Sequence, residues 1–389
     1  MTAFLKSHLA GEYNRRDALR VGGLGMFGLT LPRLLAAKEA AGNAAPAAKA
    51  KSVIFLFQWG GPSHVDMFDK KDHAPDGYRG HYDWIPTSEP GMPICEHLPE
   101  TAKVMHKVAQ IRTVHHTMNN HNSAGYTALT GVEPATDDQR LRDSIDLFPA
   151  LGSVVDAVSP NTNGMPTFVS YPHTIADGSK TPGQGASFLG KLHDPLFIPN
   201  DPNADDFSLP QLSLPAGISP ERLADRRSLQ KLINRQASSL DKSAAATGLS
   251  AYYEKALSML NSTRVRNAFD LSAEDKDVRD AYGRTTYGQG CLLARRLVQV
   301  GVPFVEVSAS VGSWDLHQGV FDSLKNQNLP QLDKGISALV TDLKQRGMLD
   351  DVTIVCMGEF GRTPRINQNV GRDHWAASWT AMVGGGGLK

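Results

Sequence analysis

The sequence predicts an α/β fold in which a mainly parallel sheet is covered by helices on both faces. Four short runs rich in β-branched and aromatic residues, at 52–57, 166–170, 303–307 and 352–357, are typical of buried strands. Segments with apolar residues at helical spacing lie between them. This alternation of strand and helix is the pattern of parallel sheets, and 389 residues of which 41% are hydrophobic can fill the core that such a sheet needs.

The individual elements follow in chain order. The run at 52–57 is uninterrupted and ends at Gly60-Gly61-Pro62, so it predicts a buried strand with a loop at its carboxyl end. Helices are expected at 148–158, 219–240, 251–260, 291–300 and 332–346. Residues 172–214 are rich in Pro, Gly, Asp and Asn and predict long inserted loops, and the charged helical pattern at 221–242 predicts a solvent-facing cap. The sequence stops at 382–389 directly after a segment with strand or helix character, so we expect the final elements of the domain to be short or missing.

The first 37 residues have the character of a twin-arginine signal peptide. Arg15-Arg16 precede an apolar stretch at 21–32, which is too short to span a bilayer, and small residues follow it. An amphipathic helix that contains an arginine pair is the alternative, but the order of basic, apolar and small regions favours a signal. We therefore expect a signal at 1–37, an Ala-rich linker at 38–51 and one domain at 52–389, exported by the twin-arginine translocase to the periplasm or cell surface.

Composition excludes several classes of protein. Lys plus Arg and Asp plus Glu are both 40, so no global field attracts nucleic acid, and no nucleic-acid-binding module is visible. No second apolar stretch is long enough to be a transmembrane segment. The three cysteines have no short paired spacing, which argues against a zinc knuckle or a disulfide framework.

The first polar cluster follows the first predicted strand. Gly60 and Gly61 allow a close backbone approach, and side chains able to bind a metal or a phosphate-like group come next: Ser63, His64, Asp66 and Asp69. A Gly-Pro turn followed by an aspartate helix cap explains the same residues, and the motif alone does not separate the two interpretations.

The second cluster, at 113–131, holds three histidines and leads into a helix of small residues. A helix start there would direct backbone N–H groups at an anion, and Asn122 or Ser123 could face it. A serine nucleophile needs a base or a metal, which His116, His121 or a bound ion could supply. An elaborate helix cap with solvated histidines is the alternative.

The third cluster is Asp315 and His317, two residues apart after the third strand run. In an extended segment they point to the same side and can share one metal ion, although a hydrogen-bonded pair in a loop is the alternative.

The fourth cluster follows the last strand run and consists of Glu359, Arg362, Arg372, Asp373 and His374. A carboxylate just past a buried strand needs a metal or an arginine to neutralise it, and Asp373 and His374 add a ligand pair. Arg362 and Arg372 could bind the oxyanions of phosphate or sulfate. A structural Glu-Arg ion pair is the alternative for Arg362.

Four separated motifs in order resemble the domain-of-unknown-function family 1501, which is common among exported bacterial proteins with twin-arginine signals. They are the first strand with Gly-Gly-Pro-Ser-x-x-Asp-x-Phe-Asp, then Trp-Asp-x-His, Gly-Glu-Phe-Gly-Arg-Thr-Pro and Gly-Arg-Asp-His-Trp. The resemblance runs from about residue 52 to the C-terminus. That family is grouped with the alkaline phosphatase and sulfatase superfamily, so the resemblance implies an alkaline phosphatase-like three-layer sandwich.

The resemblance also implies roles for single residues. The segment Asn122-Ser123 occupies the nucleophile position, Asp315 and His317 resemble a metal-binding pair, and His374 resembles the late metal-binding histidine. Glu359-Phe360 stands where an Asp-His pair is usual, so one ligand is conservative and the other is lost. Gln58 and Trp59 replace the first metal-binding aspartate, which leaves Asp66 or Asp69 as substitutes. The sulfatase signature Cys-x-Pro-x-Arg is absent, which argues against a formylglycine-dependent sulfatase.

The leading hypothesis is an exported metal-dependent hydrolase of phosphate or sulfate esters, acting on a small anionic ester or on a sulfated or phosphorylated polymer. The expected catalytic residues are His121, Asn122, Ser123 and Arg362, and the expected anion-binding residues are Arg362 and Arg372. The expected metal ligands are Asp66, Asp315, His317, Glu359, Asp373 and His374. Such ligands suit zinc, or else manganese, calcium or magnesium. A non-catalytic exported binding or surface protein that keeps the fold is the alternative.

Overall fold

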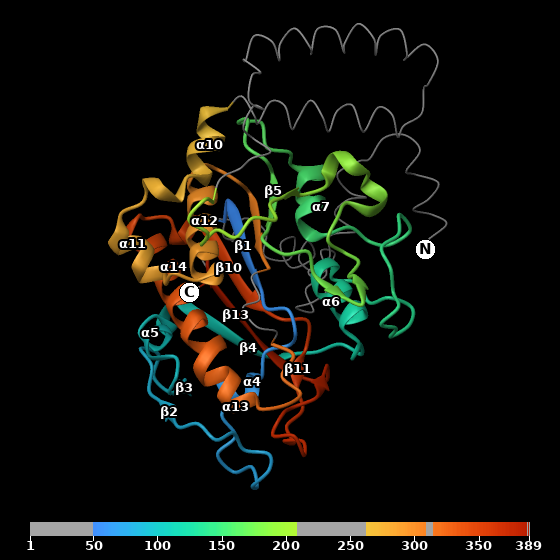
Figure 1. The fold of residues 1–389 in the computed structure, drawn as a ribbon, viewed down its shortest axis with the longest axis vertical. Coiled ribbons are helices and arrows are strands. Elements are labelled where there is room, and N and C mark those ends of the chain that lie inside the picture. The colour runs from blue at the N-terminus through green and yellow to red at the C-terminus, as the bar shows by residue number, and fades with distance from the viewer. Residues whose placement is uncertain (1–49, 208–261, 309–313, 387, 389) are drawn as a thin grey trace, which may run out of the picture.

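A seven-stranded sheet runs through the centre of the computed structural model, which describes residues 50–207, 262–308, 314–386 and 388 (Figure 1). The strand order is β4-β13-β10-β1-β9-β5-β8. Their bounds are β1 Ser52–Phe57, β4 Val108–Val114, β5 Phe168–Tyr171, β8 Leu196–Phe197, β9 Phe304–Val307, β10 Val352–Met357 and β13 Trp379–Gly385.

The sheet is mostly parallel, as the sequence predicts. β1 lies between β10 and β9 and pairs in parallel with both, and β9, β5 and β8 continue in parallel. β13 pairs antiparallel with β10 and with β4. All four predicted strands are confirmed, with the second and third beginning one or two residues later than expected.

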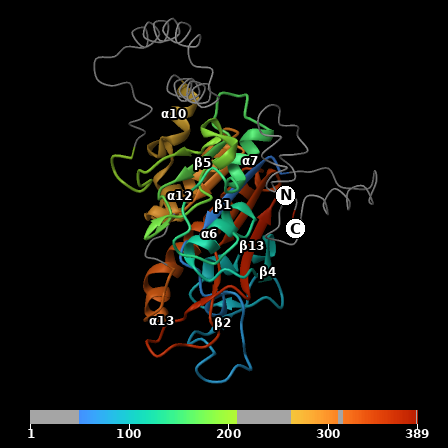
Figure 2. The ribbon, with the colours of Figure 1, turned by 90° about the vertical axis from the view of Figure 1, so that its right-hand side faces the viewer.

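Helices cover both faces because side chains alternate along the buried strands. Ile54 and Leu56 of β1 pack into a large core with α12 and α14, whereas Phe55 and Phe57 pack into a second core with residues of α6 and α7. The two pairs of helices lie on opposite sides of the sheet (Figure 1, Figure 2). The main helices are α6 His121–Thr130, α7 Leu151–Val158, α12 Thr286–Gln299 and α14 Leu329–Gln345.

The shorter elements lie between or beside these. The other α-helices are α4 His64–Met67, α5 Pro99–Ala102, α10 Thr263–Phe269, α11 Lys276–Tyr282 and α13 Val320–Ser323. The 3-10 helices are Met105–Lys107, Ser187–Leu189, Lys191–His193, Leu271–Ala273 and Leu349–Asp351, and Leu324–Asn328 is a π-helical turn. Three small ladders pair β2 Trp84–Ile85 with β3 Ile94–Cys95, β6 Ala176–Asp177 with β7 Ser179–Lys180, and β11 Gly361–Arg362 with β12 His374–Trp375.

Three of the five predicted helices are confirmed with shifted bounds. The pattern at 148–158 becomes α7, which begins at Leu151, and the patterns at 291–300 and 332–346 become parts of α12 and α14, which begin earlier. The Thr285 hydroxyl caps α12 by accepting a hydrogen bond from the Gly288 N–H, a contact that apolar periodicity does not reveal. The predictions at 1–37, 219–240, 221–242 and 251–260 lie outside the described residues, as does the predicted linker at 38–51 except for its last two residues. Within the residues described, no helix is both long and apolar enough to cross a bilayer.

Glu306 is a buried carboxyl group in the middle of the sheet. It lies on β9, and its Oε1 accepts hydrogen bonds from the hydroxyls of Ser170 at 3.0 Å and Ser308 at 3.3 Å. Burial raises the pKa of Glu306 to about 7, and the two hydroxyls oppose this rise only in part. The neutral acid is therefore the form that the folded chain favours.

We expect Glu306→Gln to weaken the pH dependence of stability. The folded pKa near 7 exceeds the ordinary value of 4.5, so the folded chain binds more protons between these pH values. Stability from this group is complete below pH 4.5 and is lost as pH rises through 7, by roughly 3 kcal/mol at about 1.4 kcal/mol per pKa unit. Urea denaturation at pH 5 and pH 8 measures the change, with the exposed Glu133→Gln as control. If the free energy of unfolding changed equally between pH 5 and pH 8 in wild type and in Glu306→Gln, the raised pKa of Glu306 would be contradicted.

Candidate metal centre

Polar segments from distant parts of the chain meet at the carboxyl edge of the central strands. β1 leads into the loop at 58–63, β10 into residues 358–360, and the segment after β9 carries Asp315 and His317. The ladder of β11 and β12 places Arg362 opposite His374, and α6 begins at His121. Sites in parallel sheets form at this edge, and the sequence predicts the same location.

A cluster of imidazole and carboxylate groups occupies this edge. One ligand atom each from His121, Asp315 and His374 lies within 4.8 Å of the other two. Asp315 Oδ2 is 3.2 Å from His121 Nε2, and Asp315 Oδ1 is 3.1 Å from His374 Nε2. His317 joins them, with its Nε2 2.9 Å from Asp315 Oδ1. Three Nε2 atoms therefore surround one carboxylate.

Each of these three imidazoles is held from behind through its Nδ1 atom. The Nδ1 acceptors are Glu359 Oε1 for His121 at 2.7 Å, the Asn119 carbonyl for His374 at 2.6 Å, and Asp373 Oδ1 for His317 at 2.8 Å. An acceptor at Nδ1 fixes the orientation of each ring and directs its Nε2 atom toward Asp315. The same backing surrounds imidazoles that bind metals.

Two of the Nε2 atoms face each other closely. His317 Nε2 and His374 Nε2 are 3.0 Å apart, and the Nδ1 atom of each ring faces an acceptor. Two ring nitrogens at this distance can share one proton or one cation between them. The geometry therefore fits a positive ion shared by the two rings.

The electrostatics of the cluster favour a positive charge beside Asp315. Burial lowers the pKa of His121, but hydrogen bonds to Asp315 and Glu359 outweigh burial and raise it to about 9. Burial would raise the pKa of Asp315, but hydrogen bonds from His121 and His374 and the Arg362 charge hold it well below its usual range. A metal ion bound here would displace the His121 Nε2 proton, so apparent metal affinity should rise with pH toward 9.

One side of the cluster is open to solvent. The side chains of His317 and Asp315 are 44% and 30% exposed, whereas that of His121 is only 9% exposed. A closed structural site would bury all its ligands, so this arrangement leaves room for a further ligand.

Aromatic rings form the inner wall. Phe360 stacks on His374 with ring centroids 4.4 Å apart and lies 5.0 Å from the His121 ring, and Trp59 also lies 5.0 Å from His121. The loop after β1 passes closely over Phe360 at Gly61, whose φ is +74° and where a Cβ atom would lie 2.5 Å from the Phe360 ring. A side chain at this position would push the loop away from the ring.

Glu359 lies behind the cluster, which differs from its expected role as a metal ligand. Its carboxylate accepts the His121 Nδ1–H and the Gly60 N–H, the latter at 2.9 and 3.1 Å to its two oxygens. His116 does not face the cluster as a base, since its Nε2–H donates to the Glu359 carbonyl at 2.7 Å. Burial lowers the pKa of His116. Glu359 therefore holds the His121 ring directly, and His116 holds the backbone of Glu359.

Arg362 has no N–H left for a substrate. A guanidinium has five N–H donors. Arg362 is fully buried, and its Nε donates to the Gly61 carbonyl, Nη1 to the Arg372 carbonyl and toward His317 Nε2, and Nη2 to the Gly60 carbonyl and Asp315 Oδ1. The expected anion-binding and catalytic role of Arg362 is therefore not available in this arrangement.

The N–H groups of Arg372 are also hydrogen-bonded within the protein. Its Nε and Nη2 bind the two Asp66 oxygens at 2.8 and 2.9 Å, and its remaining N–H groups donate to the carbonyls of Thr363, Pro364 and Tyr78. Both side chains of this pair are buried. The structure thus places Asp66, an expected metal ligand, and Arg372, an expected anion-binding residue, in an ion pair beside the cluster.

Asn122 and Ser123 are also engaged with other parts of the chain. The Ser123 hydroxyl donates to the Asp138 carbonyl at 2.9 Å and accepts from the Asp138 N–H at 2.7 Å. The Asn122 amide donates to the carbonyls of Gln139 and Asp177 and accepts from the Thr181 hydroxyl. Both side chains are fully buried, so they fix the start of α6 and with it His121.

The structure therefore brings together His121, Asp315, His317 and His374, with Glu359, Asp373 and Arg362 around them. Asn119 was not predicted, because it acts through its backbone carbonyl, which leaves no signature in the sequence. Trp59 and Phe360 stand where the family resemblance leads us to expect metal ligands, but their position as walls of the site follows only from the fold.

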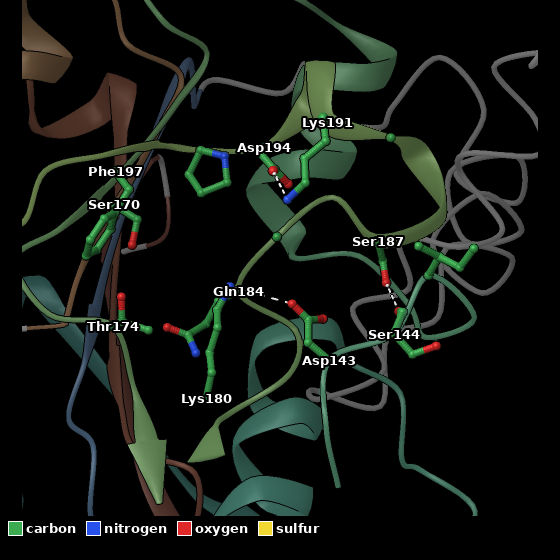
Figure 3. A pocket seen from close by; sticks show the side chains of 14 residues that line it. Asp143, Ser144, Ser170, Thr174, Lys180, Gln184, Ser187, Lys191, Asp194 and Phe197 are labelled. Atoms are coloured by element: carbon green, nitrogen blue, oxygen red, sulfur yellow. Dashed lines mark hydrogen bonds and ion pairs between the residues drawn. The ribbon is translucent and has the colours of Figure 1, made fainter. Parts of the chain in front are cut away.

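A hollow lies beside the carboxyl ends of β5 and β8 (Figure 3). It has a volume of about 460 Å³ and is bordered by Ser170 and Phe197 from the strands. Lys180 of β7 faces Asp143 across it at 3.5 Å, and Lys191 pairs with Asp194 at 2.9 Å. The hairpin of β6 and β7 that borders this hollow also holds Asn122, the residue after His121.

The fold and the cluster define an α/β protein with a candidate metal site at the carboxyl edge of its sheet. Residues 50–389 match the family described as protein of unknown function (DUF1501), so the chain belongs to that family. No curated protein and no solved structure matches the chain.

Proposed function

We propose that the protein is a metal-dependent hydrolase of phosphate or sulfate esters. The observation that carries this proposal is the convergence of three Nε2 atoms on Asp315 while each Nδ1 atom is held by an acceptor. Imidazole and carboxylate ligands without a thiolate suit zinc or manganese, and calcium or magnesium less well.

His121, Asp315 and His374 would hold a divalent ion, which would polarise an ester oxygen and lower the pKa of a water molecule. The water would lose a proton to solvent, the resulting hydroxide would attack phosphorus or sulfur, and the alkoxide would leave and take up a proton as the alcohol. Side chains around the ion position orient its ligands and exclude water. Glu359 fixes the His121 ring, Arg362 orients Asp315, and Phe360 and Trp59 keep water from the inner side. Because the Ser123 hydroxyl is occupied by Asp138, we assign the attack to water and not to serine.

The exposed side of the cluster supports a catalytic site over a closed structural ion. Asp315 and His317 reach solvent, so an ester can approach from that side. The resemblance to the alkaline phosphatase and sulfatase superfamily supports the same reaction class. The proposal includes that superfamily's three-layer sandwich and export by the twin-arginine route to the periplasm or cell surface.

We expect chelation to abolish ester hydrolysis and to leave the sheet intact. The chain is purified without added metal, its metal content is measured, and aryl phosphate and aryl sulfate are assayed before and after treatment with a chelator. Restoring zinc or manganese should restore turnover, with circular dichroism as the control for folding. Full activity in metal-free protein would contradict the proposal.

A non-catalytic binding protein is the second candidate, and the saturated arginines favour it. The N–H groups of Arg362 and Arg372 donate to acceptors inside the protein, so neither side chain donates to the oxyanion of an ester. A chain that binds metal tightly and holds phosphate or sulfate esters without hydrolysing them would support this candidate.

A further inference from the structure

Arg362 lies in a pocket of oxygen atoms that resembles the surroundings of a metal ion. Its guanidinium contacts the backbone carbonyls of Gly60, Gly61 and Arg372 and the Asp315 carboxylate. Carbonyl and carboxylate oxygens are the ligands of hard divalent cations.

The charges at the cluster balance with one divalent ion. Asp315, Glu359 and Asp373 bring three carboxylates, and the Arg362 guanidinium offsets one of these charges. One divalent ion would offset the other two. A second divalent ion would leave excess positive charge beside a buried guanidinium, which is costly in a partly desolvated site.

Arg362 also reaches the rings that face the ion position. Its Nη1 is 3.4 Å from His317 Nε2, and its Nη2 donates to the same Asp315 oxygen that lies 3.1 Å from His374 Nε2. The guanidinium therefore borders the ion position from the side of the β1 loop.

We propose that Arg362 is a built-in second cation, which takes the place that a second metal ion would need, restricts the centre to one divalent ion, and orients Asp315 toward it. This inference rests on the proposed metal centre. It assigns Arg362 a positioning role, acting through Asp315 and His317.

The test counts ions in the full chain with Arg362 intact, exchanged for a shorter cation, or removed. Manganese is titrated into wild type, Arg362→Lys and Arg362→Ala, with bound metal measured by elemental analysis and by electron paramagnetic resonance. Wild type and Arg362→Lys should each bind a single ion, since lysine keeps the charge. Arg362→Ala opens the oxygen pocket and should take up twice as much manganese, with a spin-coupled signal from two neighbouring ions.

Two results would overturn the inference. One is a wild-type chain that binds two ions while Arg362 is in place, and this result remains decisive if Arg362→Ala fails to fold. The other is a folded Arg362→Ala chain that still binds a single ion with unchanged affinity. Both results differ from failure of the proposed metal centre, in which the wild-type chain would bind no ion at all.

Discussion

Asp315→Ala is expected to lose both the metal and the activity while the sheet remains folded. The Asp315 carboxylate is the common neighbour of His121, His317 and His374. Loss of a partner behind a metal ligand commonly costs about 10–100-fold in affinity, so loss of the central ligand should cost more than about 100-fold. Elemental analysis of the purified variant and ester turnover measure the two effects.

Two aspartates make matched controls for this variant. Asp373→Asn keeps an oxygen acceptor for His317 Nδ1, so it should weaken metal binding by less than Asp315→Ala does. Asp76 pairs with Arg79 on the surface, where its side chain is 96% exposed, and Asp76→Ala should bind metal like wild type. Undiminished metal content in Asp315→Ala would remove the basis for the centre.

Asp66→Ala is expected to produce the largest loss of stability, because it leaves a buried arginine without its partner. Both members of the Asp66–Arg372 pair are buried, and they share two hydrogen bonds. Breaking such a pair from one side costs about 3–5 kcal/mol. Urea denaturation measures the cost, and the exposed Asp76→Ala variant, whose pair should contribute little, is the control.

A double variant separates the pair from its surroundings. The double variant Asp66→Leu/Arg372→Met removes both charges. Its loss of stability should be smaller than the losses of the single variants Asp66→Leu and Arg372→Met added together. Additive losses would show that the two side chains act independently. Arg372 also carries the carbonyl that holds Arg362, so metal binding in these variants reports whether the pair supports the centre.

The sequence predicts the inner strands well, because their signal is local. The run at 52–57 is apolar at every position after Ser52, and it becomes β1 with the same bounds. The sequence does not indicate β4, since its pattern mixes Gln110, Arg112 and Thr113 with apolar residues and its place beside β13 depends on pairing far along the chain. The start of α12 was placed too late, because its first turns contain Thr286, Gly288 and Gln289.

The candidate site is likewise predicted from the sequence only in part. The positions of Asp315, His317 and His374 follow from motif spacing and from the rule that sites lie at the carboxyl edge. The use of Arg362 and Arg372 could not be read from the motifs, because their partners include the Gly60 carbonyl and Asp66, which lie 302 and 306 residues away. A short motif shows which donors are present, whereas only the folded chain shows which of them are already occupied.

The cluster joins segments that are far apart in the chain. His121 and Glu359 are 238 residues apart, and Asp315 and His374 are 59 apart. In an unfolded chain these groups hardly ever meet, so a divalent ion would bind the native protein almost exclusively. Thermal melting would then depend on the free ion concentration, with about 2.7 kcal/mol gained at a hundred times the dissociation constant. A titrated shift in melting temperature would report the affinity of the ion without any knowledge of the substrate.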